Sequence, residues 1–171
     1  MKRPLKHLTH DLHHAAEQHP VGAAMAAGNI SKEWWADWLM SLLLIHNRFD
    51  HHLPQRMRRV EQLQKDLAEL SVQPLILPAA VAYARKLDTV EALEAAAYVF
   101  TGAHLMGGAI AAKANAHRLP VHHLTWDNRN EVVAMWSPYR ERADLEHEVR
   151  NAFKAILNIM EEIYANRALA G

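Results

Sequence analysis

Apolar residues recur along most of the chain at the three- and four-residue spacing of amphipathic helices, and no segment alternates convincingly with period two. Most glycines and prolines fall between these periodic segments, where they start or end helices. The pattern predicts an all-α protein with one domain over residues 1–171, and it predicts a polar loop after Leu119-Pro120. The predicted helices cover residues 4–18, 21–27, 32–52, 55–70, 78–86, 90–117 and 145–167.

Two adjacent glycines, Gly107 and Gly108, interrupt the longest predicted helix. Each glycine in a helix interior costs about 1 kcal/mol relative to alanine. The pair therefore indicates a kink, a flat and bulky group that lies against the backbone, or close packing between helices. Because a single glycine suffices for close packing, the adjacent pair favours a kink.

The composition narrows the chemistry that these helices can carry. The 171 residues include 19 Lys and Arg, 19 Asp and Glu, 13 His and no Cys. The absence of cysteine excludes disulfides, iron–sulfur clusters, thiolate zinc sites and a cysteine nucleophile. The histidines are therefore the main candidate ligands for a soft metal and the main acid–base groups near neutral pH.

Charge and hydropathy argue against two classes of partner. The formal net charge is zero, so nucleic acids and anionic membrane surfaces are not expected partners. The most apolar run, residues 39–45, is far shorter than the ~20 residues needed to cross a bilayer, and no signal peptide is apparent. We expect a soluble, cytoplasmic protein that binds neither a membrane nor nucleic acid.

The first predicted helix carries a spacing that suits a metal-binding histidine. His13 and Glu17 are four residues apart and therefore share one helix face. In such a pair one imidazole nitrogen can bind a metal while the other donates a hydrogen bond to the carboxylate. His10 and His14 have the same spacing and could also chelate a metal, but we expect them, with His7, on a solvated polar face.

The other histidines differ in what their surroundings predict. His46 lies in an apolar helix, where we expect a hydrogen-bonded core histidine. The adjacent histidines at 51–52 and at 122–123 make poor chelators because neighbouring side chains point apart, and we expect them at the surface. His104 stands three residues before Gly107, beside the predicted bend.

A second metal chemistry is also compatible with the histidine spacing. Two Asp-x-x-His pairs hint at a carboxylate-bridged di-iron site in a helical bundle, which would need two further carboxylates on facing helices. The candidate ligands are Asp11, His14, Asp144 and His147, with Glu17, Asp50 or Glu61 as the additional carboxylates. Such spacings often arise by chance in helices rich in histidine and aspartate, so a di-iron oxidase is the minor alternative.

Three segments, taken in order along the chain, resemble the heme oxygenase family. Residues 5–17 contain the pattern Lys…Thr-x-x-x-His-x-x-Ala-Glu, which resembles the N-terminal helix of that family. Residues 59–67 are similar to its Arg-x-x-x-Leu-x-x-Asp-Leu helix, and residues 98–108 to its Tyr…Gly-Asp-Leu-Ser-Gly-Gly distal helix. The resemblance spans about residues 5–160 and implies a single-domain heme oxygenase-like helical bundle with a kinked distal helix.

The resemblance implies roles for four residues at the heme faces. His13 matches the proximal histidine that binds heme iron, and Glu17 matches the partner of that histidine. Gly107 and Gly108 match the glycines that let the distal helix bend and lie against the porphyrin face. Heme is then both cofactor and substrate, and O2 with electrons from an external reductase or ferredoxin converts it to biliverdin, iron and CO.

Three further residues match positions that meet the heme propionates. Lys6 matches a cation that pairs with one propionate, and Tyr98 matches a tyrosine that also meets the propionates. Arg140 matches the second propionate cation, in a stretch where the alignment needs a gap.

One position departs from the family pattern in a way that bears on the chemistry. His104 stands where the family has an aspartate that helps to deliver protons to iron-bound oxygen. Ala103 replaces a glycine, and Phe100 replaces an arginine often found in the same network. His104 could keep the water of this network in place, or it could bind the iron as a second ligand in a non-degrading heme protein for storage, delivery or sensing. A third outcome is O–O bond cleavage and peroxidase-like chemistry.

Overall fold

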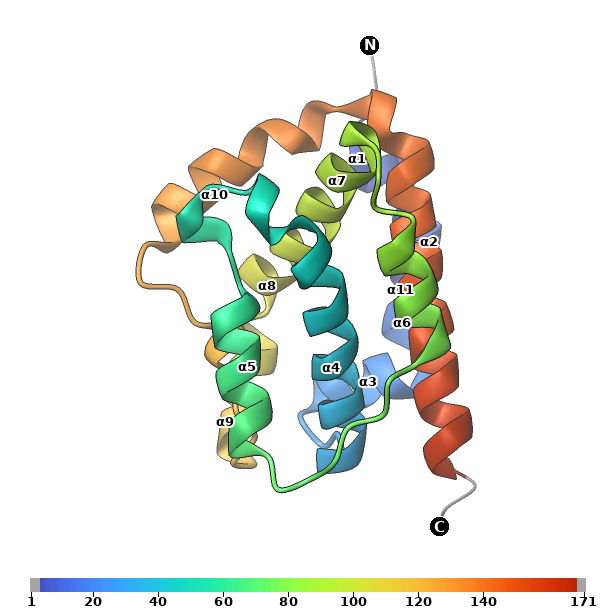
Figure 1. The fold of residues 1–171 in the computed structure, drawn as a ribbon, viewed down its shortest axis with the longest axis vertical. Helices are drawn as coiled ribbons and strands as arrows, with labels where there is room; N and C mark the ends of the chain where they lie inside the picture. The colour runs from blue at the N-terminus through green and yellow to red at the C-terminus, as the bar shows by residue number, and fades with distance from the viewer. Residues whose placement is uncertain (1–3, 169–171) are drawn as a thin grey trace.

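A computed structural model describes residues 4–168, and this part of the chain is helical without β-strands, which confirms the predicted all-α class (Figure 1). The α-helices are α1 (Leu5–Leu8), α2 (His10–Gln18), α3 (Pro20–Ala27), α4 (Lys32–Phe49), α5 (Val60–Glu69), α6 (Pro78–Arg85), α7 (Val90–Ala96), α8 (Gly102–Met106), α9 (Gly108–Ala116), α10 (Arg129–Trp136) and α11 (Glu146–Ala168). The short helical turns are η1 (Asp50–His52), η2 (Gln55–Met57), η3 (Ala97–Thr101), η4 (His122–Leu124), η5 (Ser137–Glu141) and η6 (Ala143–Leu145).

Helix α4 is at the centre of the fold, where it packs against α5, α6 and α11. Its start is fixed by Ser31, whose side chain accepts a hydrogen bond from the Trp34 N–H. Its buried face carries Trp35, Leu39 and Phe49, each at most 1% exposed. Burial of a large apolar side chain stabilises a fold by about 1.5–3 kcal/mol. This face therefore anchors α4, the helix that also carries His46.

The N-terminal helix, predicted as one segment, is interrupted at Thr9 between α1 and α2. Thr9 is buried, and its hydroxyl donates a hydrogen bond to the Leu5 carbonyl 2.9 Å away. A threonine side chain that bonds to a carbonyl four residues earlier competes with the helical backbone. The break leaves α2 as a separate nine-residue helix that packs against α11 and α3.

Residues 90–116 form one long, bent helical rod. Thr89 caps α7 by accepting a hydrogen bond from the Ala92 N–H, and the chain continues through the π-helical turn η3 into α8. The axis then bends by 53° between Met106 and Gly108, where the glycine pair predicts a kink. Single π-helical turns inside α-helices are rare and occur frequently at functional sites.

The stretch predicted as a polar loop is largely helical, because it contains η4, α10, η5 and η6. Trp136 of α10 is buried, and its Nε1–H donates to the Tyr98 carbonyl at 2.9 Å. It packs so closely on Gly102 that a Cβ there would lie 2.8 Å from the indole. The prediction of a loop was wrong because α10 buries only Val132 and Trp136, too few apolar positions for a periodic signal.

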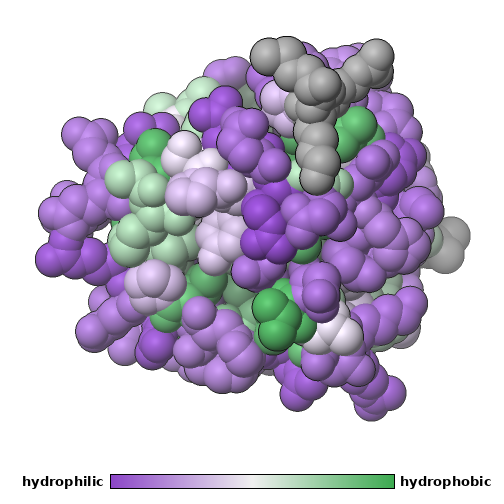
Figure 2. Space-filling view, turned by 90° about the horizontal axis from the view of Figure 1, so that it is seen from above, coloured by the Kyte–Doolittle hydropathy of each residue, from purple (hydrophilic) through white to green (hydrophobic). Residues whose placement is uncertain are grey.

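Figure 2 views the molecule from above the top of Figure 1 and shows a mostly hydrophilic surface with several separate hydrophobic areas. Within residues 4–168 no single helix is long and apolar enough to cross a membrane. The bent pair Val90–Met106 and Gly108–Ala116 reaches that length and composition only when both parts are counted together.

Candidate functional site

Helices α2 and α8, which carry His13 and His104, are held in place by shared neighbours. Helix α2 packs against α11 and α3, while α8 continues from η3, which also packs against α11. At one end α3 packs against α9, and at the other end α1 packs against η5 and η6. Helices α11 and α3 therefore connect α2 to the rod formed by η3, α8 and α9.

His13 projects from α2 with a carboxylate partner on the same helix face. Its Nδ1 lies 3.4 Å from Glu17 Oε1, and each of the two side chains is 58% exposed. Phe153 of α11 meets the His13 ring edge-on, with the ring centroids 5.8 Å apart. Since Nδ1 faces the carboxylate, Nε2 is the nitrogen left to bind a metal ion. The geometry thus contains the pairing that the spacing predicts.

The three residues matched to propionate positions lie on elements that meet. Lys6 is exposed on α1, which packs against η5, the turn that carries Arg140. Tyr98 is half-buried in η3, where its ring stacks on Trp136 with centroids 5.6 Å apart. Burial raises the pKa of the Tyr98 hydroxyl, and the charge of Arg140 opposes that rise. Arg140 and Tyr98 therefore lie near each other, and the element that carries Lys6 packs against the turn that carries Arg140.

The two glycines at the bend have different surroundings. A Cβ on Gly107 would lie 2.7 Å from Leu124 Cδ2, so the absence of a side chain permits close packing there. A Cβ on Gly108 would meet no atom within 4 Å. Ala103 and Met106 of α8 are also exposed, Met106 by 61%. The open side of the bend therefore presents small or flexible apolar groups, which suit a flat apolar ligand.

His104 lies in the core, with its side chain in contact with α4. Its side chain is buried, and its Nε2 lies 2.9 Å from Nε2 of His46 in α4. The two rings stack with centroids 5.0 Å apart, and His46 Nδ1 lies 2.6 Å from Asp50 Oδ1. Asp50, His46 and His104 therefore form a buried hydrogen-bonded chain that joins η1 to α8. The expectation that His46 is a hydrogen-bonded core histidine is confirmed.

A second buried Asp–His pair meets His104 from another direction. His123 is 1% exposed, its Nδ1 lies 2.5 Å from Asp66 Oδ2, and its ring is perpendicular to that of His104 with centroids 5.3 Å apart. Asp66 also accepts the backbone N–H groups of His122 and His123, which draws η4 into the core. The prediction that His123 lies at the surface was therefore wrong, whereas His122 is exposed as predicted.

These surroundings keep His104 uncharged. Burial lowers the pKa of His104 well below its usual value, and the nearby His46, His123 and Arg59 lower it further. Burial alone would raise the pKa of Asp50, but the hydrogen bond and charge of His46, with two backbone N–H groups, hold that pKa below its usual value. Near neutral pH the hydrogen-bonded chain of Asp50, His46 and His104 therefore has a neutral imidazole at its His104 end and a carboxylate at its Asp50 end.

The sequence carries a signal for only part of this arrangement. His46 and Asp50 have the same four-residue spacing as His13 and Glu17, so their pairing could have been proposed from the sequence. The contact of His46 with His104 joins residues 58 positions apart, and local spacing cannot predict it.

The π-helical turn before His104 carries a buried aromatic ring and a buried, unpaired hydroxyl. Phe100 packs near Phe49 and Tyr83, with ring centroids 6.2 and 6.0 Å away. Thr101 Oγ1 is buried and has no hydrogen-bond partner among the described residues. A buried hydroxyl in this state is able to accept or donate a hydrogen bond to a water or a ligand atom.

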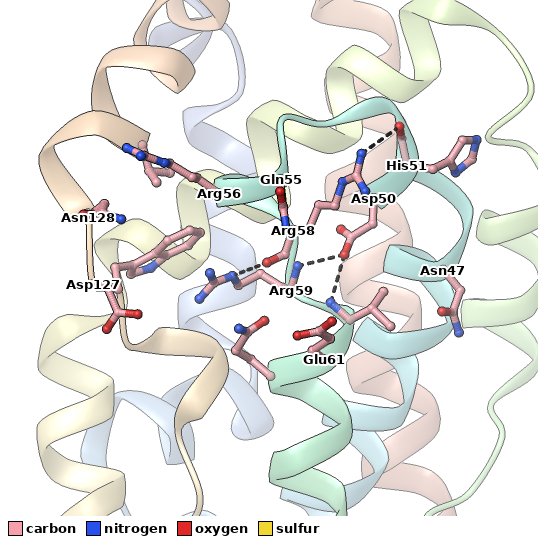
Figure 3. Close-up of a pocket in the computed structure, with 14 residues that line it drawn as sticks. Asn47, Asp50, His51, Gln55, Arg56, Arg58, Arg59, Glu61, Asp127 and Asn128 are labelled. Carbon is pink, nitrogen blue, oxygen red and sulfur yellow. Dashed lines mark hydrogen bonds between the residues drawn. The ribbon is translucent and has the colours of Figure 1, made fainter.

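A pocket of about 650 Å³ lies at the other end of the buried chain, where Asp50 forms part of its wall (Figure 3). Arg56, Arg58 and Arg59 make the lining strongly polar. The Arg59 guanidinium carbon lies 3.6 Å from the centroid of the Trp126 ring, and burial lowers the pKa of Arg59 to about 10. The residues matched to the heme site of the family do not line this pocket.

The residues suggested as ligands of a di-iron site are not brought together in the fold. Asp11 pairs with both nitrogens of Arg150 at 2.9 and 2.8 Å, and Asp144 pairs with Arg142. Among residues 4–168 no group of three or more histidine, aspartate and glutamate side chains is arranged to hold a metal ion. The remaining histidines expected at the surface are exposed, namely His7, His10, His14, His51 and His52.

Comparison with known proteins identifies the family. The model of the heme oxygenase family matches residues 1–162 of the chain. Heme oxygenase-1 from the cyanobacterium Synechocystis sp. PCC6803, solved in complex with heme, has a TM-score of 0.79 and 19% identity, over 97% of this chain and 93% of that chain. The heme oxygenase from Leptospira interrogans has a TM-score of 0.76 and 18% identity, over 92% of this chain and 97% of that chain. No curated protein matches the chain in sequence. Since the family match extends over nearly the whole chain, the chain belongs to the heme oxygenase family.

Proposed function

We propose that this protein binds heme through His13 and cleaves it oxidatively to biliverdin, iron and CO, with electrons from an external donor. Family membership supports heme as both cofactor and substrate. The observation that carries the proposal is the exposed His13 imidazole, paired with Glu17, in a chain that matches the family over residues 1–162. When bound, heme supplies the iron centre that activates O2 and the macrocycle that is opened.

The residues present fit a heme on three counts. His13 offers Nε2 as the ligand nitrogen because Nδ1 faces Glu17. The exposed side of the bend at Gly108 and Met106 is apolar, and no atom lies within 4 Å of a Cβ added at Gly108, which suits close approach of a porphyrin face. Lys6 and the η5 cation lie on elements that pack together, so both could pair with the propionates.

Each of these residues has a distinct physical task. Glu17 accepts a hydrogen bond from His13 Nδ1–H, which fixes the tautomer and raises the basicity of Nε2. Lys6 and Arg140 orient the ring by pairing with its carboxylates, and Tyr98 donates a hydrogen bond from its neutral hydroxyl. Gly108 leaves the backbone of α9 bare, so the distal helix can approach the ring closely and exclude water.

His104 favours the degrading reaction over a bis-histidine heme protein. A second iron ligand must present a ring nitrogen to the metal, whereas His104 Nε2 is hydrogen-bonded to His46 and the ring is 3% exposed. Rotation of His104 toward the open side would leave His46 without that partner in a buried site, at a cost of about 1–3 kcal/mol. We therefore assign His104 to proton handling rather than to iron ligation.

Spectroscopy of the heme complex tests this function. The full chain is titrated with ferric heme, then supplied with a reductase and NADPH or with ascorbate in air, with catalase present to remove free peroxide. We expect the Soret band to fade while biliverdin absorption grows and CO is released. Persistence of the Soret band through many electron equivalents would contradict heme cleavage, and the absence of any heme complex would contradict the proposal as a whole. His10→Ala serves as the control because His10 is exposed on the same helix as His13.

A further inference from the structure

The Asp50–His46–His104 chain lies in the core and joins two parts of the molecule. His46 uses both ring nitrogens: Nδ1 lies 2.6 Å from Asp50 Oδ1, and Nε2 lies 2.9 Å from His104 Nε2. His46 is 0% exposed, Asp50 6% and His104 3%. These three side chains are almost fully shielded from bulk water. The protons of their hydrogen bonds are therefore confined to a few nitrogen and oxygen atoms.

We infer that Asp50, His46 and His104 form a buried triad that stores one proton and exchanges it at Nδ1 of His104. The inference deepens the proposed function, on which its role in heme cleavage rests, but the store itself is a property of the heme-free chain. Asp50 and His46 act in it as positioning residues, because they work through His104.

The hydrogen-bond chemistry of the chain allows two proton arrangements. A carboxylate at Asp50 can only accept, so His46 always carries a proton on Nδ1. The contact between the two Nε2 atoms needs one proton, because two lone pairs or two N–H groups would repel. If His46 is neutral, His104 supplies that proton and its own Nδ1 is bare. If His46 is an imidazolium, His46 supplies it and His104 carries its proton on Nδ1.

One proton converts the first arrangement into the second. It binds to the bare Nδ1 of His104, and the shared proton moves from His104 Nε2 to His46 Nε2. The N–H bond at His104 Nε2 breaks, that at His46 Nε2 forms, and the positive charge rests on His46 beside the Asp50 carboxylate. The reverse transfer releases one proton at His104 Nδ1, so atoms and charge balance without an oxidant or a reductant.

The structure fixes the carboxylate end of the triad. Asp50 Oδ2 accepts the backbone N–H groups of Arg59 and Val60 at 2.8 and 2.9 Å, which leaves Oδ1 for His46. Figure 3 shows the Asp50 carboxylate at the wall of the pocket, with dashed lines to two backbone nitrogens of the segment that begins at Arg59. The charge partner of His46 therefore cannot rotate away without breaking three hydrogen bonds.

The other charged groups around the triad keep its charge away from His104. Arg59 lies near Asp50. Burial of His104 and the positive charge of Arg59 both disfavour an imidazolium at His104. His123 faces His104 edge-on, but its Nδ1 is committed to Asp66 at 2.5 Å. These groups leave the imidazolium beside Asp50 as the favourable place for the stored proton. In the proposed reaction this store supplies a proton on the distal helix, where the family has an aspartate.

Nitrogen NMR of the heme-free full chain tests the inference directly. Long-range 1H–15N spectra report the protonation of each imidazole nitrogen between mildly acidic and mildly alkaline pH. We expect His46 to gain its Nε2 proton in the same step, with the same midpoint, in which His104 changes from the Nε2–H to the Nδ1–H tautomer. Independent midpoints for the two changes would overturn the inference, and so would a His104 tautomer that stays fixed throughout the titration.

Two matched variants separate the triad from the general effect of a buried carboxylate. Asp50 and Asp66 each accept two backbone N–H groups and one histidine, so Asp50→Asn and Asp66→Asn disturb similar contacts. Asp50→Asn should lower the shared midpoint by at least about one pH unit, since it removes the adjacent negative charge. Asp66→Asn should leave the coupling of His46 and His104 in place. Equal effects of the two variants would overturn the inference, and the wild-type titration decides the question if either variant fails to fold. Because no heme is present, the outcome is independent of heme binding.

Discussion

His13 and His104 carry the proposed function from opposite environments. His13 is 58% exposed and has one partner, Glu17, on the same helix face. His104 is 3% exposed, and its partner comes from α4, 58 residues earlier. A half-exposed imidazole with one occupied nitrogen can receive a ligand, whereas a buried imidazole inside a hydrogen-bonded chain contributes by holding a proton. Two histidines in one proposed heme site therefore need not both be iron ligands.

The largest effect should come from His13→Ala, which removes the proposed iron ligand. We expect heme cleavage to fall more than about 1,000-fold, or about 4 kcal/mol, because loss of a ligand costs more than the loss of its hydrogen-bond partner. The free energy of unfolding should change by less than about 0.5 kcal/mol, since the side chain is exposed. Imidazole added to the variant should restore the ferric heme spectrum. An unchanged spectrum without imidazole would show that His13 is not the ligand.

His46→Ala removes the buried partner of His104 and should lower the stability of the fold. The change leaves Asp50 Oδ1 and His104 Nε2 buried without their partner, so we expect a loss of about 2–3 kcal/mol in the free energy of unfolding. Urea denaturation measures this loss, with the exposed His122→Ala as the control. A loss below about 0.5 kcal/mol would mean that the buried chain contributes nothing to the fold.

The pH dependence of stability should follow the buried histidines. Burial lowers the pKa of both His104 and His123 in the folded state, so protons bind the unfolded chain preferentially. Their contribution is present above an unfolded pKa of about 6.5 and is lost as the pH falls below it, by up to about 1.4 kcal/mol per pH unit for each histidine that stays neutral. Urea unfolding at a series of pH values checks the sign. Stability that rises between neutral and mildly acidic pH would contradict it.

The smallest effects should distinguish the two glycines at the bend. Gly107→Ala places a methyl group 2.7 Å from Leu124 Cδ2 and should cost about 1 kcal/mol. Gly108→Ala meets no atom and should gain up to about 1 kcal/mol from helix propensity, while it weakens heme binding by covering the open face. Thermal unfolding and heme titration of both variants test this contrast. Equal heme affinity in the Gly108 variant and the wild type would place the porphyrin elsewhere.

Local spacing explains what the sequence could and could not predict. The His13–Glu17 pair and the kink at Gly107 and Gly108 depend on neighbours in one helix, and both are present in the fold. The inward direction of His104 depends on α4 and η4, and no spacing within α8 encodes it.

Short or exceptional elements escaped prediction for related reasons. Helix α10 was missed because it buries only two residues, and the break at Thr9 depends on one side-chain hydrogen bond to Leu5. His123 was placed at the surface because its partner Asp66 lies 57 residues away. Periodicity therefore predicts long helices well, and it fails where a distant polar partner decides the position of a residue.

The ligation state of the ferric heme complex tests the central claim, which is that His13 alone binds the iron while His104 stays in the core. Electron paramagnetic resonance at mildly acidic pH distinguishes the two cases. We predict a high-spin signal with one histidine ligand, lost in His13→Ala and preserved in His104→Ala. A low-spin, bis-histidine signal in the wild type that becomes high-spin in His104→Ala would contradict the account.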